Sequence, residues 1–148
     1  MSTRADNITQ TQKIQDVFSD FLDDLTPHPI THDVGRVRNE QSINQSIRNL
    51  ILTKIGERFF QPNIGSNVYN SLFEPNDAFM QEDLVYSIRN VIDQNEPRAI
   101  IQNVTVNPVY SQMTLTIDES RIAINVVYSI INTPIQIQTL NLILRRDR

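Results

Sequence analysis

The stretch Arg121–Ile130 reads RIAINVVYSI, with a large apolar side chain at every second position. An alternation of period two is typical of a β-strand that buries one face and exposes the other. The apolar face of this strand comprises Ile122, Ile124, Val126, Tyr128 and Ile130. The stretch therefore predicts a sheet in the last third of the chain.

The segments on either side of this strand carry the same alternation. Before it, Val104 and Val106 alternate with polar residues, and the run 113–117 (MTLTI) does so as well. No acidic residue lies between Arg121 and Asp147, so the last strand lacks charges that commonly protect a sheet edge. Such a strand pairs either within its own sheet or with another chain, and the pattern leaves both options open.

The last strand changes phase part-way along its length. Its apolar residues first share one parity and then the other: Ile135 and Ile137, followed by Leu140, Leu142 and Leu144. The change predicts either a β-bulge near Gln138 and Thr139 or a strand whose two halves face different partners.

Upstream of the sheet, apolar residues recur with the period of an amphipathic helix. One helix is predicted over Gln41–Lys54, with Asn39 or Ser42 as its cap and Gly56 as its C-terminal end. A second helix is predicted from about Ala78 to Asn95, because a proline two residues further on blocks its continuation.

The remaining segments are less regular. Apolar spacing over Ile14–Leu25 predicts a short helix that must end at Pro27, followed by an extended linker to residue 39. The segment Glu57–Asp77 contains two prolines and a glycine, and we expect an irregular segment pinned to the core by its aromatic side chains. These side chains are Phe59, Phe60, Tyr69 and Phe73.

The order of these elements indicates the fold class. Helices come first and strands last, which is typical of an α+β fold. We predict two to three helices packed on a small, mainly antiparallel C-terminal β-sheet, preceded by an extended N-terminal arm. Because 148 residues with 39% hydrophobic side chains suffice for one core, we assign residues 1–40 to an arm or linker and 41–148 to a single domain.

Composition excludes several classes of function. The net charge of −4 disfavours binding to nucleic acid, which needs clustered lysine and arginine. No run approaches 18 apolar residues and the N-terminus lacks the order of a secretory signal, so we expect neither a membrane protein nor a Sec-exported one. Without cysteine there is no thiolate metal site, and nothing in the sequence indicates a cofactor.

Candidate catalytic and metal-binding residues are few. His28 and His32 have the spacing of a helical metal motif, but Pro29 between them would break that helix. A glycosidase needs only two carboxylates that flank the scissile bond. The carboxylates that adjoin turns are Glu57, Glu74 and Glu96. The simpler interpretation is that they are solvated or cap the turns.

Three short motifs follow one another: Gly56-Glu57-Arg58-Phe59-Phe60-Gln61-Pro62 with Gly65, then Leu72-Phe73-Glu74, then Glu96-Pro97-Arg98. Over about residues 41–148, their order and spacing resemble the baseplate wedge family of contractile-tailed phages. This family is also called the sheath initiator or lysozyme-like baseplate family, and it has a relative in type VI secretion systems. Many members have a proline or another residue in place of Phe60. In the family, the region around Phe18-Ser19-Asp20 tends to be an extended arm, which conflicts with the helix predicted here.

The resemblance implies a structural subunit without enzymatic activity. It implies docking on other wedge proteins through Glu96, Pro97 and Arg98, and initiation of the tail sheath through the C-terminal strands. The strand residues concerned are Ile122, Ile124, Val126, Ile135, Ile137, Leu140, Leu142 and Leu144. The implied partners are other wedge proteins, the tail sheath protein and the inner tube or hub. The implied location is the virion tail baseplate, with synthesis in the host cytoplasm.

Two alternatives stay open at the level of sequence. Glu96 and Arg98 would contribute little if they merely cap the helix end and pair with each other at the surface. The lysozyme-like name of the family suggests a peptidoglycan hydrolase, which would use Glu57, Glu74 or Glu96 as its carboxylates.

Overall fold

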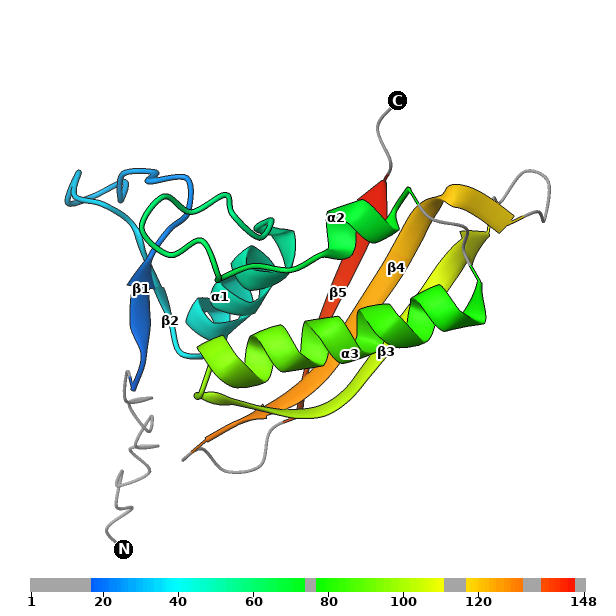
Figure 1. The fold of residues 1–148 in the computed structure, drawn as a ribbon. Coiled ribbons are helices and arrows are strands. Elements are labelled where there is room, and N and C mark those ends of the chain that lie inside the picture. The colour runs from blue at the N-terminus through cyan, green and yellow to red at the C-terminus, as the bar shows by residue number, and fades with distance from the viewer. Residues whose placement is uncertain (1–16, 74–76, 111–116, 132–136, 146–148) are drawn as a thin grey trace, which may run out of the picture.

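The computed structural model describes residues 17–73, 77–110, 117–131 and 137–145. Within them it shows helices followed by a C-terminal three-stranded antiparallel sheet (Figure 1), which confirms the α+β prediction. In chain order the elements are β1 (Ser19–Phe21), β2 (Arg36–Arg38), α1 (Glu40–Leu52), α2 (Val68–Ser71), α3 (Ala78–Asn95), β3 (Ala99–Tyr110), β4 (Ile117–Ile130) and β5 (Ile137–Arg145).

The three-stranded sheet has β4 in the middle and β3 and β5 at its edges. The stretch Arg121–Ile130 falls in β4, and its predicted apolar face is buried, with at most 6% exposure for any member. Register shifts occur between β3 and β4 near Ile101 and near Pro108. Residues 111–116, which carry part of another predicted strand, lie outside the described residues.

Strand β5 pairs with β4 without a register shift along its length, so the predicted bulge near Gln138 and Thr139 is wrong. Instead, Ile137 lies on the exposed face of the sheet, whereas Leu142 and Leu144 are buried. The change of phase arises because the two halves of the strand place their apolar side chains on opposite faces.

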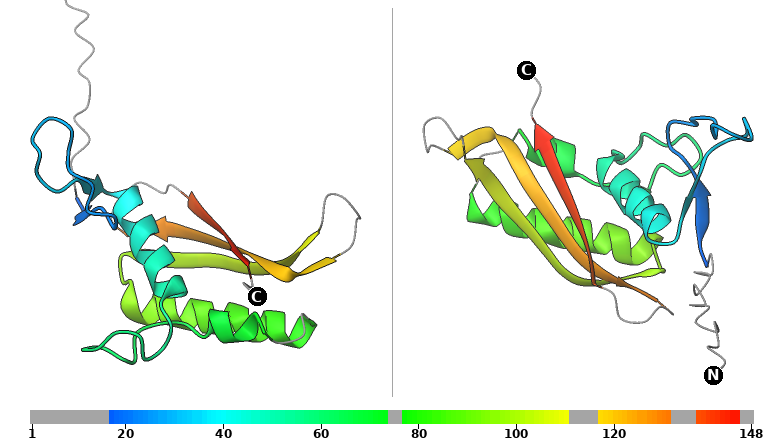
Figure 2. Two further views of the ribbon diagram at one scale, coloured as in Figure 1. Left: turned by 90° about the horizontal axis from the view of Figure 1, so that it is seen from above. Right: turned by 180° about the vertical axis from the view of Figure 1, so that it is seen from behind.

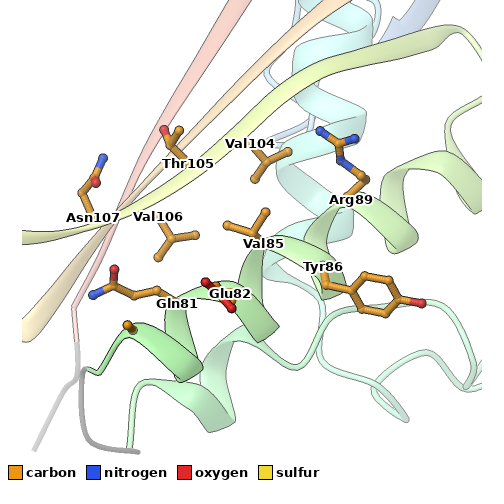
Figure 3. A pocket seen from close by; sticks show the side chains of 10 residues that line it. Gln81, Glu82, Val85, Tyr86, Arg89, Val104, Thr105, Val106 and Asn107 are labelled. Carbon is orange, nitrogen blue, oxygen red and sulfur yellow. The ribbon is translucent and has the colours of Figure 1, made fainter.

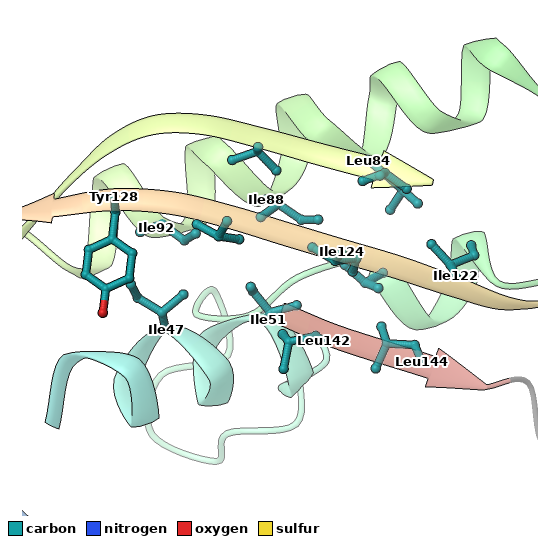
Figure 4. Close-up of a cluster of buried hydrophobic side chains, with 14 of the residues drawn as sticks. Ile47, Ile51, Leu84, Ile88, Ile92, Ile122, Ile124, Tyr128, Leu142 and Leu144 are labelled. Atoms are coloured by element: carbon teal, nitrogen blue, oxygen red, sulfur yellow. The ribbon is translucent and has the colours of Figure 1, made fainter. Parts of the chain in front are cut away.

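The helices lie on one face of this sheet, and no described helix covers the other face (Figure 2). The core forms between them, where α3 packs against β3 and α1 against β5, together with the buried face of β4 (Figure 4). The largest fully buried aliphatic side chains of the core are Ile43, Ile47, Ile51, Leu84, Ile88, Ile92 and Ile124. Complete burial of an isoleucine or leucine side chain contributes about 1.5–3 kcal/mol to the free energy of unfolding.

Both predicted central helices are present. Helix α3 has the predicted bounds, and Asp77 caps it by accepting a hydrogen bond from the Met80 backbone N–H at 2.8 Å. Helix α1 ends at Leu52 and not at Gly56, so the predicted glycine cap is wrong. Gly56 has φ +88° and serves the turn that follows the helix.

The helix predicted over Ile14–Leu25 is wrong for its described part. Residues 19–21 form β1, which pairs antiparallel with β2 in a two-stranded sheet. Asn39 occupies the N-cap position of α1, but its side chain does not cap that helix. Its Oδ1 accepts hydrogen bonds from the Val17 and Phe18 backbone N–H groups, at 2.8 and 3.2 Å. These contacts across more than 20 residues override the local helical spacing.

The segment between α1 and α2 also differs from the prediction. Phe59 and Phe60 are 97% and 99% exposed, and Phe73 is 61% exposed, so none of the three pins this segment to the core. Only Tyr69 packs against the core, where it is partly buried. Phenylalanines are normally recruited to a core by hydrophobicity, and here the backbone of the loop carries two of them away from it.

Candidate partner-binding surfaces

The motif Glu96-Pro97-Arg98 forms the turn between α3 and β3, and we call it the corner. Arg98 donates two parallel hydrogen bonds to the Glu96 carboxylate, from Nε to Oε1 and from Nη2 to Oε2, both at 2.6 Å. Such a bidentate charged pair is among the stronger polar contacts in proteins. Glu96 is 2% exposed, whereas Pro97 is exposed and the Arg98 side chain is 28% exposed.

The Glu96 carboxylate is stabilised in its charged form. Burial, the largest influence on its pKa, acts to raise it. Hydrogen bonds from Arg98 and Ser46, together with the charge of Arg98, outweigh burial and hold the pKa below its usual value. The same hydrogen bonding to Glu96 raises the pKa of Arg98. The corner is therefore a closed ion pair, as in the alternative in which Glu96 and Arg98 pair with each other.

The N-terminal segment lies against the corner. The guanidinium carbon of Arg98 is 5.5 Å from the centroid of the Phe18 ring, within the range of a cation–π contact. Asp20 adds a further electrostatic interaction with Arg98. Asn39 fixes this arrangement, because it holds the Phe18 backbone through hydrogen bonds. Sequence reasoning missed Ser46 and Asn39 here, since no local pattern connects them to Glu96.

Tyr128 of β4 is a buried polar side chain whose pKa is influenced by Glu96 of the corner. It is fully buried, and its hydroxyl donates a hydrogen bond of 2.8 Å to Asn44 Oδ1 of α1. Burial, followed by the negative charges of Glu40 and Glu96, raises the pKa of Tyr128 to about 12. The phenol thus remains neutral and ties the middle strand to α1.

The predicted strand residues occupy different positions in the sheet. Ile122, Ile124 and Val126 point into the core. They belong to the middle strand, β4, so both edges of their strand are already paired. Leu142 and Leu144 are buried, Leu140 is partly buried, and Ile137 is exposed. Ile135 lies outside the described residues. Strand β5 is an edge strand of the sheet, as β3 is: one of its edges pairs with β4, and no described strand pairs with the other.

A groove of about 510 Å³ lies between α3 and β3 (Figure 3). Val85, Val104 and Val106 supply apolar walls, with Glu82 and Arg89 as its charged side chains. A two-carboxylate hydrolytic site needs a second carboxylate at a defined distance from the first. The residues that line this groove contain one, Glu82.

Among the described residues, the remaining candidates for catalysis or metal binding do not line this groove. Glu57 Oε2 accepts a hydrogen bond from the Lys54 backbone N–H, Glu96 is in the corner, and Glu74 lies outside the described residues. His28 and His32 lie in a turn, in which His28 Nδ1 accepts from backbone N–H groups. The described residues contain no cluster of three or more potential metal ligands. None of their helices is long and apolar enough to span a membrane.

Comparison with known proteins defines the family. A family model described as "Baseplate wedge protein gp25" matches residues 37–135, two thirds of the chain. The chain belongs to this family. The baseplate wedge protein gp25 of Enterobacteria phage T4 is 30% identical over 110 residues, which make up 74% of this chain and 78% of that protein. The matched range includes the corner and the exposed phenylalanines, and it ends before β5.

Solved structures share the fold of this wedge-family chain. A putative tail lysozyme from Geobacter sulfurreducens aligns with a TM-score of 0.62 and 22% identity, over 74% of this chain and 92% of that chain. A chain of the anti-feeding prophage baseplate aligns with a TM-score of 0.59 and 17% identity, over 88% of this chain and 87% of that chain. At these identities the likeness concerns the fold alone.

Proposed function

We propose that this protein is a structural subunit of a contractile-tail baseplate, without enzymatic activity, and that it carries the first layer of tail sheath. In this proposal it docks on other wedge proteins through the corner and offers β5 to the tail sheath protein. The inner tube or hub is a further neighbour. The site of action is the virion tail baseplate, after synthesis in the host cytoplasm, and neither nucleic acid nor membrane is a partner.

The open edge of β5 is the observation that carries the sheath part of the proposal. An unpaired strand edge presents backbone N–H and C=O groups that another strand can pair with. The exposed face of β5 holds Ile137, Thr139, Asn141 and Ile143, and its one charged residue, Arg145, lies at the C-terminal end of the strand. The middle-strand residues Ile122, Ile124 and Val126 support this edge from the core and do not contact the partner themselves.

The corner supports docking in a modified form. Since Glu96 is buried and bound to Arg98, its role is to orient the guanidinium. Pro97 and the exposed part of Arg98 are what a partner touches. A planar cationic group at a fixed turn suits backbone carbonyls at the C-terminal end of a partner helix, which carry partial negative charge.

The hydrolase alternative has less support. Glu57 and Glu96 each have an internal hydrogen-bond partner, and neither lines the groove between α3 and β3. A cell-wall turbidity assay at high protein concentration tests this point. Turnover that Glu57→Gln, Glu74→Gln or Glu96→Gln abolishes would overturn the structural proposal.

Co-purification after co-expression with the wedge and sheath proteins tests the two contacts separately. The corner variant is Glu96→Gln/Arg98→Met, which removes both charges together and so leaves no unpaired buried ion. The edge variant is Thr139→Lys/Asn141→Lys, because lysines block strand addition at an edge. Its matched control is Asn125→Lys, on the same face but in the middle strand, opposite Asn141.

We expect the corner variant to lose the wedge proteins and keep the sheath protein, and the edge variant to do the reverse. The Asn125→Lys control should bind both. If the corner variant keeps the wedge proteins, the corner is only a helix terminus. If the edge variant keeps the sheath protein, the edge of β5 is not the contact. Thermal melts of each variant confirm that it folds.

A further inference from the structure

We infer that the loop between α1 and α2 inserts Phe59 and Phe60 as an anchor into an apolar, acid-rimmed pocket of a neighbouring baseplate protein. We call Arg58, Phe59 and Phe60 the aromatic tip. This contact is separate from the corner and from the edge of β5. It rests on the proposed role of the chain in an assembly, and it adds a third surface to it.

The aromatic tip is held out by the backbone. The Gln61 N–H donates to the Arg58 carbonyl at 3.3 Å, so Phe59 and Phe60 are the two central residues of a four-residue turn. Such positions normally carry glycine, proline, asparagine, aspartate or serine. Two adjacent phenylalanines there contradict both turn preference and the hydrophobic effect, and no contact with the described residues explains their place.

The loop beneath the tip is closed by its own hydrogen bonds. The Gly56 N–H donates to the Pro62 carbonyl and the Ser66 N–H to the Thr53 carbonyl, both at 2.8 Å. At Gly65, where φ is +147°, a Cβ atom would lie 2.7 Å from the Thr53 carbonyl oxygen. The two ends of the loop therefore approach too closely for any side chain. A loop fixed in this way presents its tip at little further cost in conformational entropy.

The shape of the tip argues for a pocket on a different protein. Figure 2 shows the loop projecting from the helix layer, away from the β1–β2 sheet. Two phenylalanines expose about 300–500 Å² together, less than the roughly 800 Å² per partner of a standard interface. The tip is thus one part of a larger contact, and a projecting tip does not complement a second projecting tip.

The charges at the tip indicate which charged residues surround that pocket. Glu57 turns its carboxylate back to the Lys54 backbone N–H, at 2.9 Å. The Lys54 ammonium lies 5.0 Å from the centroid of the Tyr69 ring, at the base of the loop. Arg58 is exposed next to the phenylalanines and is the charge that a partner meets. Carboxylates on the rim of the pocket complement it.

The test uses the full chain co-expressed with the wedge and sheath proteins of its system. The variant Phe59→Ser/Phe60→Ser should lower the yield of assembled complex by at least about tenfold, as expected for a buried aromatic anchor. The matched control is Phe79→Ser, another phenylalanine that is 80% exposed, in the first turn of α3, and it should assemble as wild type. Arg58→Glu should weaken assembly and Arg58→Lys should largely preserve it.

A photo-crosslinker at the tip identifies the occupant. With p-benzoylphenylalanine in place of Phe60, we expect a crosslink to another baseplate protein at an apolar site with nearby acidic residues. A crosslink to a second copy of this chain would overturn the inference, as would binding of the wild type, but not the serine variant, to phosphatidylcholine vesicles. Unchanged assembly of the serine variant would overturn it as well.

The test of the aromatic tip can be distinguished from the test of the corner. If the corner variant assembles normally and the tip variant does not, the corner proposal fails and the inference stands. If the opposite holds, the inference alone fails.

Discussion

The corner and the aromatic tip reverse the usual placement of side chains, in opposite senses. At the corner, a carboxylate is 2% exposed; at the tip, two phenylalanines are almost completely exposed. The buried charge has its partners in its own chain, in Arg98 and Ser46. The exposed rings have no partner among the described residues that would explain their position. A buried charge with partners in its own chain points to stability, whereas adjacent aromatic rings held outward at the tip of a closed loop point to a partner.

Of changes at these two regions, breaking the ion pair at the corner should have the larger effect on folding. Glu96→Gln removes the charge that Arg98 and Ser46 bind, and we expect the free energy of unfolding to fall by about 2–4 kcal/mol, reduced by the partial exposure of Arg98. Urea denaturation at pH 7 measures this loss. A loss below about 0.5 kcal/mol would show that the pair does not stabilise the fold.

The same contribution should disappear in acid. Because folding lowers the pKa of Glu96 from its usual 4.5, its contribution to stability is complete above that value. It is lost as the pH falls through the lower pKa of the folded state. The difference in stability between wild type and Glu96→Gln should therefore narrow below about pH 4.5. A difference that stays constant down to pH 2 would contradict the assigned ion pair.

Tyr128, which lies near the corner, should make stability depend on pH in the alkaline range. Folding raises its pKa from 10.0 to about 12, so its contribution is complete below pH 10 and is lost as the pH rises toward 12. The stability of wild type relative to Tyr128→Phe should decline over this interval and stay level between pH 7 and 9. Denaturation curves in a pH series test this, and a flat difference up to pH 12 would rule it out.

The aromatic tip should show the smallest effect on folding. Phe59→Ser/Phe60→Ser removes side chains that contribute almost no buried surface, so the free energy of unfolding should change by less than about 0.5 kcal/mol. Ile88→Ala, in the core, should by contrast cost about 2–5 kcal/mol. A comparable loss for the tip variant would mean that the rings support the fold, and the contrast between the two regions would fail.

Helices and strands that depend on side-chain periodicity were predictable from the sequence. Helix α3 has the predicted bounds, and the buried face of β4 is the one that the alternation in Arg121–Ile130 indicated. The residues of the corner were also found by sequence, through a motif. Their partners Ser46 and Phe18 were not, because those contacts join segments about 50 and 80 residues away, and no local pattern encodes them.

The failures share a physical cause. Ile14–Leu25 has helical spacing, but residues 19–21 gain more from pairing with β2 and from the hydrogen bonds of Asn39. Phe59 and Phe60 were predicted to lie in the core because hydrophobicity describes what a side chain prefers. It does not describe where a closed loop places it.

The sequence by itself determined the α+β class, the order of α1, α3 and the C-terminal strands, and the buried face of β4, since periodicity is a local property that each element carries alone. Only the tertiary structure decided which charge is buried in a closed pair, which strands lie at the edges of the sheet and which aromatic residues face outward. These outcomes depend on hydrogen bonds and packing between distant segments, whose energies no local pattern contains.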